Sequence, residues 1–110
     1  MDNERKYEYK KVHREIRENL AIIGLSETEQ DTLFALMEFQ QPLPVSILAL
    51  ELEMPRQTAN TILKNMSKRG IIIKSKKDGM AHFHANQDQI SIYVDALCDK
   101  LKRAKIALTK

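Results

Sequence analysis

Apolar positions along most of the chain recur every three or four residues, which is the spacing of one helix face. The pattern predicts helices over residues 3–23, about 27–40, 45–52, about 55–69 and from about 87 onward. Gly24 and Gly70 follow two of these segments, as suits helix ends. The expected inward residues are Tyr9, Val12, Ile16, Leu20 and Ile23, then Leu33, Leu36 and Met37, then Val45, Leu48, Ala49 and Leu52, then Ala59, Ile62, Leu63 and Met66.

Two places give the predicted helices definite boundaries. Ser26 and Glu29 have the spacing of a capping box, in which each side chain bonds the backbone of the other residue. The segment 42–44 contains two prolines and breaks the chain before the helix over 45–52. Residues 53–55 form a tight connection, because Pro55 cannot continue a helix but can begin one.

Strand patterns occur between Gly70 and residue 86. Residues 71–75 are rich in isoleucine, residues 80–85 alternate, and residues 76–79 end in Asp-Gly, which suits a tight hairpin. The alternation places Phe83 on the core side. The order of elements predicts a mainly α protein with a small β-hairpin, a winged helix-turn-helix flanked by N- and C-terminal helices. We expect an N-terminal helix at 1–24, the winged helix-turn-helix at 25–85 and a coiled-coil-like dimerisation helix at 86–110.

The last predicted helix has an apolar seam with steps of four and three residues, typical of a coiled coil. So small a domain cannot cover the whole seam, and monomers avoid exposed apolar stripes. We expect a homodimer built from this helix with help from the N-terminal one, although both helices folding back on their own domain is the alternative. The expected interface residues are Val12, Ile16, Ile90, Val94, Leu97, Leu101, Ala104 and Leu108.

Positive charge is concentrated in one part of the chain. The sequence has 18 basic and 15 acidic residues and a net charge of +3. Between Pro55 and Lys77 there are seven basic residues, Arg69 among them, and no acidic one, whereas the rest carries 11 basic and 15 acidic residues. A continuous basic segment is expected for a surface that faces phosphates, although a solvated basic helix without a partner gives the same count.

The predicted helix over about 55–69 has the composition of a DNA recognition helix. One side is apolar and can pack on its own domain, and the other is polar and free of acidic residues. Such a helix fits the major groove, where amides such as Gln57 and Asn60 can read adenine. The other candidates on the helix are Arg56 for guanine or phosphate, Thr61, Lys64 and Lys68. On the hairpin the candidates are Lys74, Lys76, Lys77 and His82, which would meet flanking backbone or minor groove.

Two segments resemble a known family. Residues 25–29 with 33–36, and residues 54–60 followed by 62–66 and 68–72, are similar to TrmB-like and MarR-like winged-helix transcriptional regulators. The resemblance implies a dimeric regulator of double-stranded DNA whose residues Arg56, Gln57, Thr58, Asn60, Thr61 and Lys64 face DNA. One helix follows the predicted wing where TrmB-like regulators carry a large effector domain, which argues against a small-molecule effector.

Other kinds of function have little support in the sequence. No phosphate-binding loop, nucleophile elbow or HExxH motif occurs, so neither an enzyme nor a cofactor is expected. His82 and His84 share one strand face, but a stable metal site needs more ligands, and no metal is expected. Cys98 is a lone cysteine that serves either as a small hydrophobe or as a redox reporter across a dimer.

The sequence leaves two rivals to a sequence-specific regulator. One is a non-specific nucleoid protein on the same fold, and the other is a winged helix used for protein–protein assembly. No apolar run reaches the length of a membrane span, and the charged N-terminus shows no secretory signal. The protein is therefore expected to be soluble, to have no membrane partner, and to act in the cytoplasm at the nucleoid.

Overall fold

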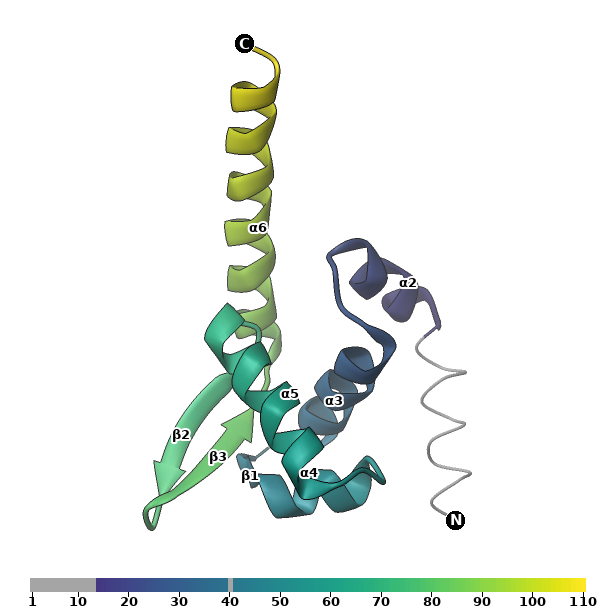
Figure 1. Ribbon diagram of the computed structural model, residues 1–110, viewed down its shortest axis with the longest axis vertical. Helices are drawn as coiled ribbons and strands as arrows, with labels where there is room; N and C mark the ends of the chain where they lie inside the picture. The colour runs from purple at the N-terminus through teal and green to yellow at the C-terminus, as the bar shows by residue number, and fades with distance from the viewer. Residues whose placement is uncertain (1–13, 40) are drawn as a thin grey trace.

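The computed structural model describes residues 14–39 and 41–110, and their order is that of a winged helix-turn-helix (Figure 1). The predicted N-terminal helix over 3–23 is described from Arg14 onward, so Val12 lies outside the described residues. The elements are α2 (Arg14–Ile22), α3 (Glu27–Glu38), β1 (Leu43–Pro44), α4 (Val45–Glu51), α5 (Arg56–Arg69), β2 (Ile73–Lys77), β3 (Met80–His84) and α6 (Gln87–Leu108).

The connection from α2 to α3 follows the predicted signals. Gly24 has a φ of +92°, and the amide of Leu25 donates to the carbonyl of Leu20, a pattern that closes a helix C-terminus. The capping box is confirmed, because Ser26 Oγ accepts from the Glu29 amide at 3.2 Å and Glu29 Oε1 accepts from the Ser26 amide at 2.9 Å. These bonds satisfy donors that the start of a helix otherwise leaves open.

Arg17 fastens α2 to α3. Its guanidinium pairs with Asp31 and lies 5.0 Å from the ring centroid of Phe34. Leu20 and Leu25 are buried in the same region. Within the described residues, α2 is therefore attached to α3 by the buried Leu20 and by the guanidinium of Arg17.

The core lies where α3, α4 and α5 meet the inner side of the sheet. Leu36, Leu48, Leu63, Met66 and Phe83 are completely buried, one or two from each of these elements. The predicted apolar stripes on α4 and α5 are confirmed, except that Ile62 is only partly buried. These contacts fix α5 against the domain and leave its other side exposed.

The sheet has three strands in the order β1-β3-β2, all antiparallel. Asp78 and Gly79 both have positive φ, at 53° and 76°, which is the two-residue type I′ turn that suits the twist of a hairpin. Phe83 faces the core from the central strand, as predicted, and is paired with Leu43 of β1. The hairpin projects from one side of the domain as the wing (Figure 1).

Four sequence expectations differ from the structure. Residues 42–44 do not merely break the chain, because Leu43 and Pro44 form β1. The first hairpin strand lies over Ile73–Lys77 rather than 71–75, since Ile71 and Ile72 are buried in the connection from α5. The turn is consequently residues 78–79 alone, and Lys77 belongs to the strand. The α3 helix ends at Glu38, two residues before the expected end.

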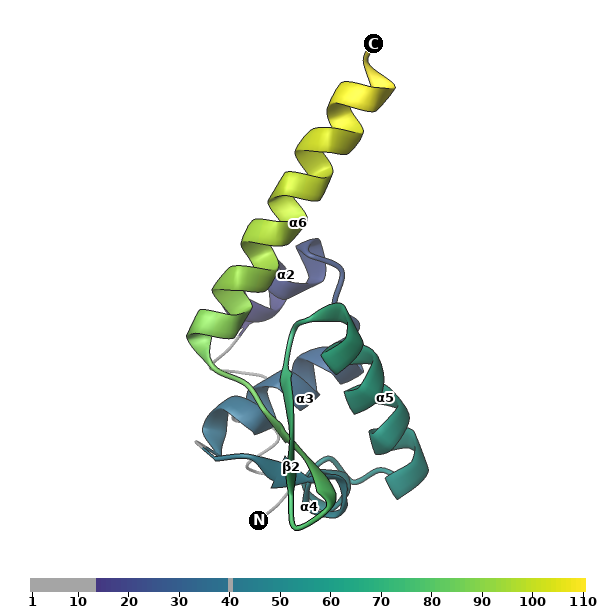
Figure 2. The ribbon, with the colours of Figure 1, turned by 90° about the vertical axis from the view of Figure 1, so that its left-hand side faces the viewer.

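The last helix, α6, begins at the predicted cap and then leaves the domain. Asn86 Oδ1 accepts from the Gln89 amide at 2.7 Å. None of the 22 residues of α6, all of which the structure describes, is buried. Its C-terminal part extends well beyond the other elements (Figure 1 and Figure 2). No helix within the described residues is long and apolar enough to cross a membrane.

Candidate nucleic-acid interface

Helix α5 presents a polar face whose position is fixed by its buried side. Ala59, Leu63 and Met66 anchor it, with at most 1% of each residue exposed. Gly70 ends the helix in the left-handed conformation at a φ of +86°. Asn60 is half-buried and the other candidates on this helix are exposed, namely Arg56, Gln57, Thr58, Thr61, Lys64 and Lys68. All seven candidates thus lie on the part of α5 that is not packed in the core, with Arg56 and Thr58 on opposite flanks of the helix.

The N-terminal end of α5 is open to anions. It begins after Pro55, no side chain caps it, and its first turn contains no acidic residue. The amide groups and the dipole at such an end favour negative charge. Thr61 Oγ1 donates to the Gln57 carbonyl at 3.0 Å, so this hydroxyl keeps its lone pairs for an incoming donor and presents its methyl group.

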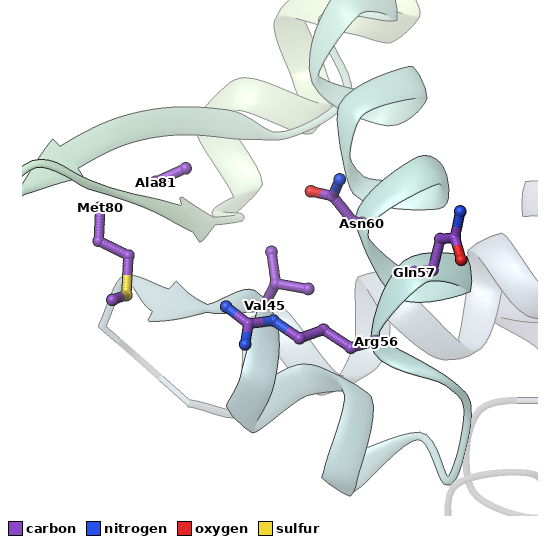
Figure 3. A pocket seen from close by; sticks show the side chains of 6 residues that line it. All are labelled: Val45, Arg56, Gln57, Asn60, Met80 and Ala81. Atoms are coloured by element: carbon purple, nitrogen blue, oxygen red, sulfur yellow. The ribbon is translucent and has the colours of Figure 1, made fainter.

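A groove of about 500 Å³ separates the start of α5 from β3 (Figure 3). Arg56 and Asn60 point into it from α5, and Gln57 also lines it, although the amide end of Gln57 points to another side of the helix. Val45, Met80 and Ala81 supply its apolar lining. The groove therefore combines a guanidinium and an amide over an apolar wall, a combination that can hold a sugar-phosphate chain or the edge of a base.

The basic residues of the wing are all exposed but do not share one face. Lys74 pairs with Phe83 and Lys76 with Ala81, so these two lysines lie on the core-facing side of the hairpin. Lys77 pairs with Met80 on the other side, where half-buried His82 also lies. The His82 ring nitrogen Nδ1 is 3.0 Å from the Met80 carbonyl oxygen. The wing thus offers positive charge on both faces near its tip.

Arg69 is exposed, but its guanidinium is bonded to neighbouring side chains rather than left for phosphates. Its guanidinium pairs with Glu29 at 2.8 Å and donates to the Tyr93 hydroxyl at 3.2 Å. Partial burial would lower the pKa of Arg69, but its bonds to Tyr93 and the charge of Glu29 outweigh burial and raise that pKa. Arg69 therefore stays charged and joins α5 to α3 and α6, which corrects its inclusion in the phosphate-facing charge.

A second bond attaches the end of α5 to α6. The Gln89 side-chain amide donates to the carbonyl of Gly70. Together with the bond between Arg69 and Tyr93, it fixes the first two turns of α6 to the last turn of α5. Polar side chains on two different helices thus set the direction in which α6 leaves the domain.

The expected dimer residues divide into two groups. Ile90, Val94 and Leu97 are half-buried near the domain, whereas Leu101 and Leu108 are 61% and 85% exposed and Ala104 is also exposed. Ile16 lies within α2, and Val12 lies outside the described residues. The seam is thus covered by its own domain only at its N-terminal end.

The sequence also raised a metal site at His82 and His84 and a redox role for Cys98. Within residues 14–39 and 41–110, no three histidine, cysteine or acidic side chains gather closely enough to hold a metal ion. Cys98 is an exposed free cysteine on α6. Among the described residues, no further metal-binding side chain therefore joins His82 and His84.

Sequence reasoning missed parts of this surface that depend on tertiary contacts. Val45 and Met80 line the groove, yet nothing in their local pattern distinguishes them from core or loop residues. The pairing of Arg69 with Glu29 spans 40 residues, so no local spacing rule could have found it. The one available signal was the position of Arg69 in the last turn of its helix, which the helix dipole also explains.

Comparisons with known proteins agree with this geometry. The family model described as "Sugar-specific transcriptional regulator TrmB" matches residues 20–95. No significant match is found among curated proteins. The structure of ST1889 from Sulfolobus tokodaii is 18% identical with a TM-score of 0.67, and covers 90% of this chain and 99% of its own.

Two MarR-type regulators share the fold. The multidrug efflux regulator MepR of Staphylococcus aureus is 16% identical with a TM-score of 0.59, over 96% of this chain and 84% of its own. SPO1453 of Silicibacter pomeroyi is 14% identical with a TM-score of 0.57, over 94% of this chain and 74% of its own. At these identities the likeness shows the fold, while the family match spans more than half of the chain. The protein belongs to the TrmB family and is a DNA-binding transcriptional regulator of the winged-helix type, with the fold of MarR-type regulators.

Proposed function

We propose that the protein binds specific sequences of double-stranded DNA as a homodimer, with α5 in the major groove and the wing over residues 74–84 on flanking backbone or minor groove. The observation that carries the proposal is the acid-free polar face of α5 beside the exposed lysines of the wing. An anion-accepting helix end lies between them, at the start of α5. Such a regulator acts on chromosomal DNA in the nucleoid.

The proposed division of labour follows the chemistry of each group. Asn60 and Gln57 carry paired donors and acceptors that match adenine, and Arg56 can bind guanine or a phosphate. Thr58, Thr61, Lys64 and Lys68 extend the same surface along α5. Lys74, Lys76, Lys77 and His82 hold the flanking backbone, where contacts position the protein without reading sequence.

The wing lysines are expected to contribute affinity without selectivity. Replacing Lys76 and Lys77 with alanine removes two phosphate contacts, so binding to all duplexes should weaken alike and the salt slope should fall by about 2. Mobility-shift titrations at several salt concentrations measure both. The pair Arg103→Ala and Lys110→Ala, which removes the same charge from α6 and the residues that follow it, should leave the slope unchanged.

Several results would contradict this assignment. One is a parent protein that fails to bind any duplex at low salt. Another is an affinity that does not fall as salt rises, since release of counterions requires that fall. Equal slopes for the wing variant and its parent would remove the wing from the interface and leave α5 alone.

Asn60 is expected to contribute selectivity. Asn60→Ala should reduce discrimination at one base pair by about 1–3 kcal/mol, because an amide that bonds adenine at two atoms is lost. Selection of bound sequences from a random duplex pool, done for variant and parent, measures the change. Asn65→Ala is the matched control, since Asn65 is an exposed asparagine of the same helix outside the groove.

The same selection separates the rival functions. A parent that enriches no sequence is a non-specific nucleoid protein. An Asn65→Ala variant that changes the preferred site as much as Asn60→Ala would overturn the proposed orientation of α5. A parent protein that binds no DNA, but captures a protein partner even after nuclease treatment, would favour an assembly module.

A further inference from the structure

We infer that the groove between the start of α5 and β3 holds one deoxyribose of a DNA strand and thereby distinguishes DNA from RNA. The inference rests on the proposed binding of double-stranded DNA and adds which part of the nucleic acid enters the groove. The groove has a volume of about 500 Å³, and sites that hold a group the size of a small molecule have roughly 300–1,000 Å³. It therefore has room for a sugar and its phosphate.

The two sides of the groove belong to the two elements that are proposed to contact DNA. Its polar lining, Arg56, Gln57 and Asn60, comes from α5, and Met80 and Ala81 line it from the wing strand β3 (Figure 3). In a duplex, one sugar-phosphate strand separates the major groove from the neighbouring minor groove. A protein with α5 in the major groove and its wing on the flanking backbone or minor groove therefore straddles this strand, and the groove is the space in which the strand fits.

The charge of the groove suits a nucleic-acid strand. The guanidinium of Arg56 points into it, and none of the described residues that line it is acidic. A planar guanidinium can bond two oxygens of one phosphate. The start of α5, where no acidic residue lies in the first turn, adds to the attraction for a phosphate. Arg56 is therefore assigned to a phosphate of this strand rather than to guanine.

The apolar part of the lining indicates which other part of the strand it meets. Val45, Met80 and Ala81 form this apolar wall, and Met80 is 50% exposed in the free protein. A phosphate gains nothing from apolar surface, whereas the C2′ methylene of a deoxyribose is itself apolar and gains from being covered. In RNA the same carbon carries a hydroxyl that donates and accepts hydrogen bonds. The wall therefore matches deoxyribose and not ribose.

The wall offers a 2′-hydroxyl no side-chain partner. The backbone of Met80 and Ala81 is engaged in the pairing of β3 with β2. The Met80 carbonyl oxygen also lies 3.0 Å from His82 Nδ1. A 2′-hydroxyl turned toward this wall would lose water without gaining a bond, which should weaken binding by about 5–10-fold. We expect this low end of the usual cost because Met80 is half exposed and the groove is not sealed from water.

A scan with single ribonucleotides tests the inference. The probe is the duplex enriched from the random pool, with one deoxynucleotide at a time replaced by the ribonucleotide of the same base. Mobility shifts should show binding of the parent weakened about 5–10-fold at one or two positions of each half-site. Arg56 and Asn60 are about 6 Å apart along α5, and successive nucleotides of a strand are about 3.4 Å apart along the duplex. The sensitive sugar should therefore lie within about two nucleotides of the base pair whose preference changes in Asn60→Ala.

Two variants of Met80 separate contact with the wall from a change in duplex shape, since a ribonucleotide also alters the local sugar conformation. Met80→Gln introduces an amide of similar length that can bond the 2′-hydroxyl, so the discrimination at the sensitive sugar should fall to about 2-fold or less. Met80→Leu keeps the wall apolar and should discriminate as the parent does. Because Met80 is 50% exposed, both variants should fold normally, which circular dichroism verifies.

Neutral phosphates provide an independent measurement on Arg56. A methylphosphonate linkage removes one phosphate charge, so binding of the parent should weaken when the linkage next to the sensitive sugar is replaced. Arg56→Gln should be nearly indifferent to that replacement, and its salt slope should be smaller than that of the parent by about 1. A variant with an unchanged slope and a changed preferred base would mean that Arg56 binds a base, which would contradict the assigned occupant of the groove.

The possible outcomes of the ribonucleotide scan are distinct. A parent that binds the all-DNA duplex and tolerates a ribonucleotide at every position would overturn the inference, while the proposed function would stand. Equal discrimination by Met80→Gln and the parent would overturn it too, because duplex shape rather than the wall would be the cause. A parent that binds no duplex, or that enriches no sequence, would instead remove the proposed function and the inference with it.

Discussion

Replacing Leu101 with aspartate is expected to convert the proposed dimer into a monomer and to weaken DNA binding by about 10²–10⁴-fold. Leu101 lies in the middle of the seam on α6 and is 61% exposed in a single copy. A carboxylate there would have to lose water without gaining a partner whenever two seams met. A monomer carries one DNA-binding domain, so it loses the gain in affinity that two linked domains obtain from binding two half-sites together.

Ile92 provides the matched control for this experiment. It lies on the same helix, is also 61% exposed, and is not part of the seam. Ile92→Asp should therefore leave both the dimer and the DNA affinity unchanged. Sedimentation velocity and mobility shifts at the same protein concentrations measure the two quantities. A dimeric Leu101→Asp protein, or equal losses for both variants, would place the interface elsewhere.

Replacing Phe83 with alanine is expected to reduce the free energy of unfolding by about 3–5 kcal/mol. Phe83 is completely buried on the central strand β3 and is paired with Leu43 on one side and Lys74 on the other. Its loss leaves a cavity between the sheet and the helices. Since the total free energy of unfolding of a small domain is about 5–15 kcal/mol, the variant should be close to unfolding.

Met80 serves as the control for Phe83. It is on the same strand but 50% exposed, so Met80→Ala should cost less than about 1 kcal/mol. Urea denaturation followed by circular dichroism, at one protein concentration because a dimer's stability depends on concentration, compares the two. Losses of similar size would show that the wing contributes little to the core and would contradict the central position of Phe83.

The helices were predictable because their signals are local. The stripe on α5 and the capping box at Ser26 and Glu29 depend on residues within one or two turns, and both are confirmed. The hairpin was also predictable, since Asp78-Gly79 accepts the positive φ values that a type I′ turn requires. Hydrophobic periodicity and turn chemistry therefore account for the order of the elements.

Other features could not be predicted because they depend on what the rest of the chain does. The strand β1 is two residues long, includes Pro44, and exists only because β3 pairs with it. Ile71 and Ile72 have a strand-like composition, but the core takes both as the chain leaves α5. Arg69 is a residue type that often contacts DNA, but its position in the fold places it in an ion pair with Glu29.

The candidate DNA surface was predictable as a set of residues but not as a shape. The polar face of α5 follows from helix geometry once its apolar stripe is known. The groove beside Arg56 and Asn60 depends on how close β3 comes to α5, which no sequence spacing encodes. The division of the wing lysines between two faces arises because β2 continues through Lys76 and Lys77, which the sequence had assigned to the turn, and successive strand residues point to opposite faces.

The two bonds that join the end of α5 to α6 couple the orientations of these two helices. Gln89 holds the carbonyl of Gly70 and Tyr93 holds Arg69, so a tilt of α5 moves α6 as well. Over the roughly 33 Å length of 22 residues, a tilt of about 5° displaces the far end by about 3 Å. A displacement of that size is comparable to the rise of one base pair. In the proposed homodimer, small tilts of α5 would therefore be coupled to the spacing of the two DNA half-sites.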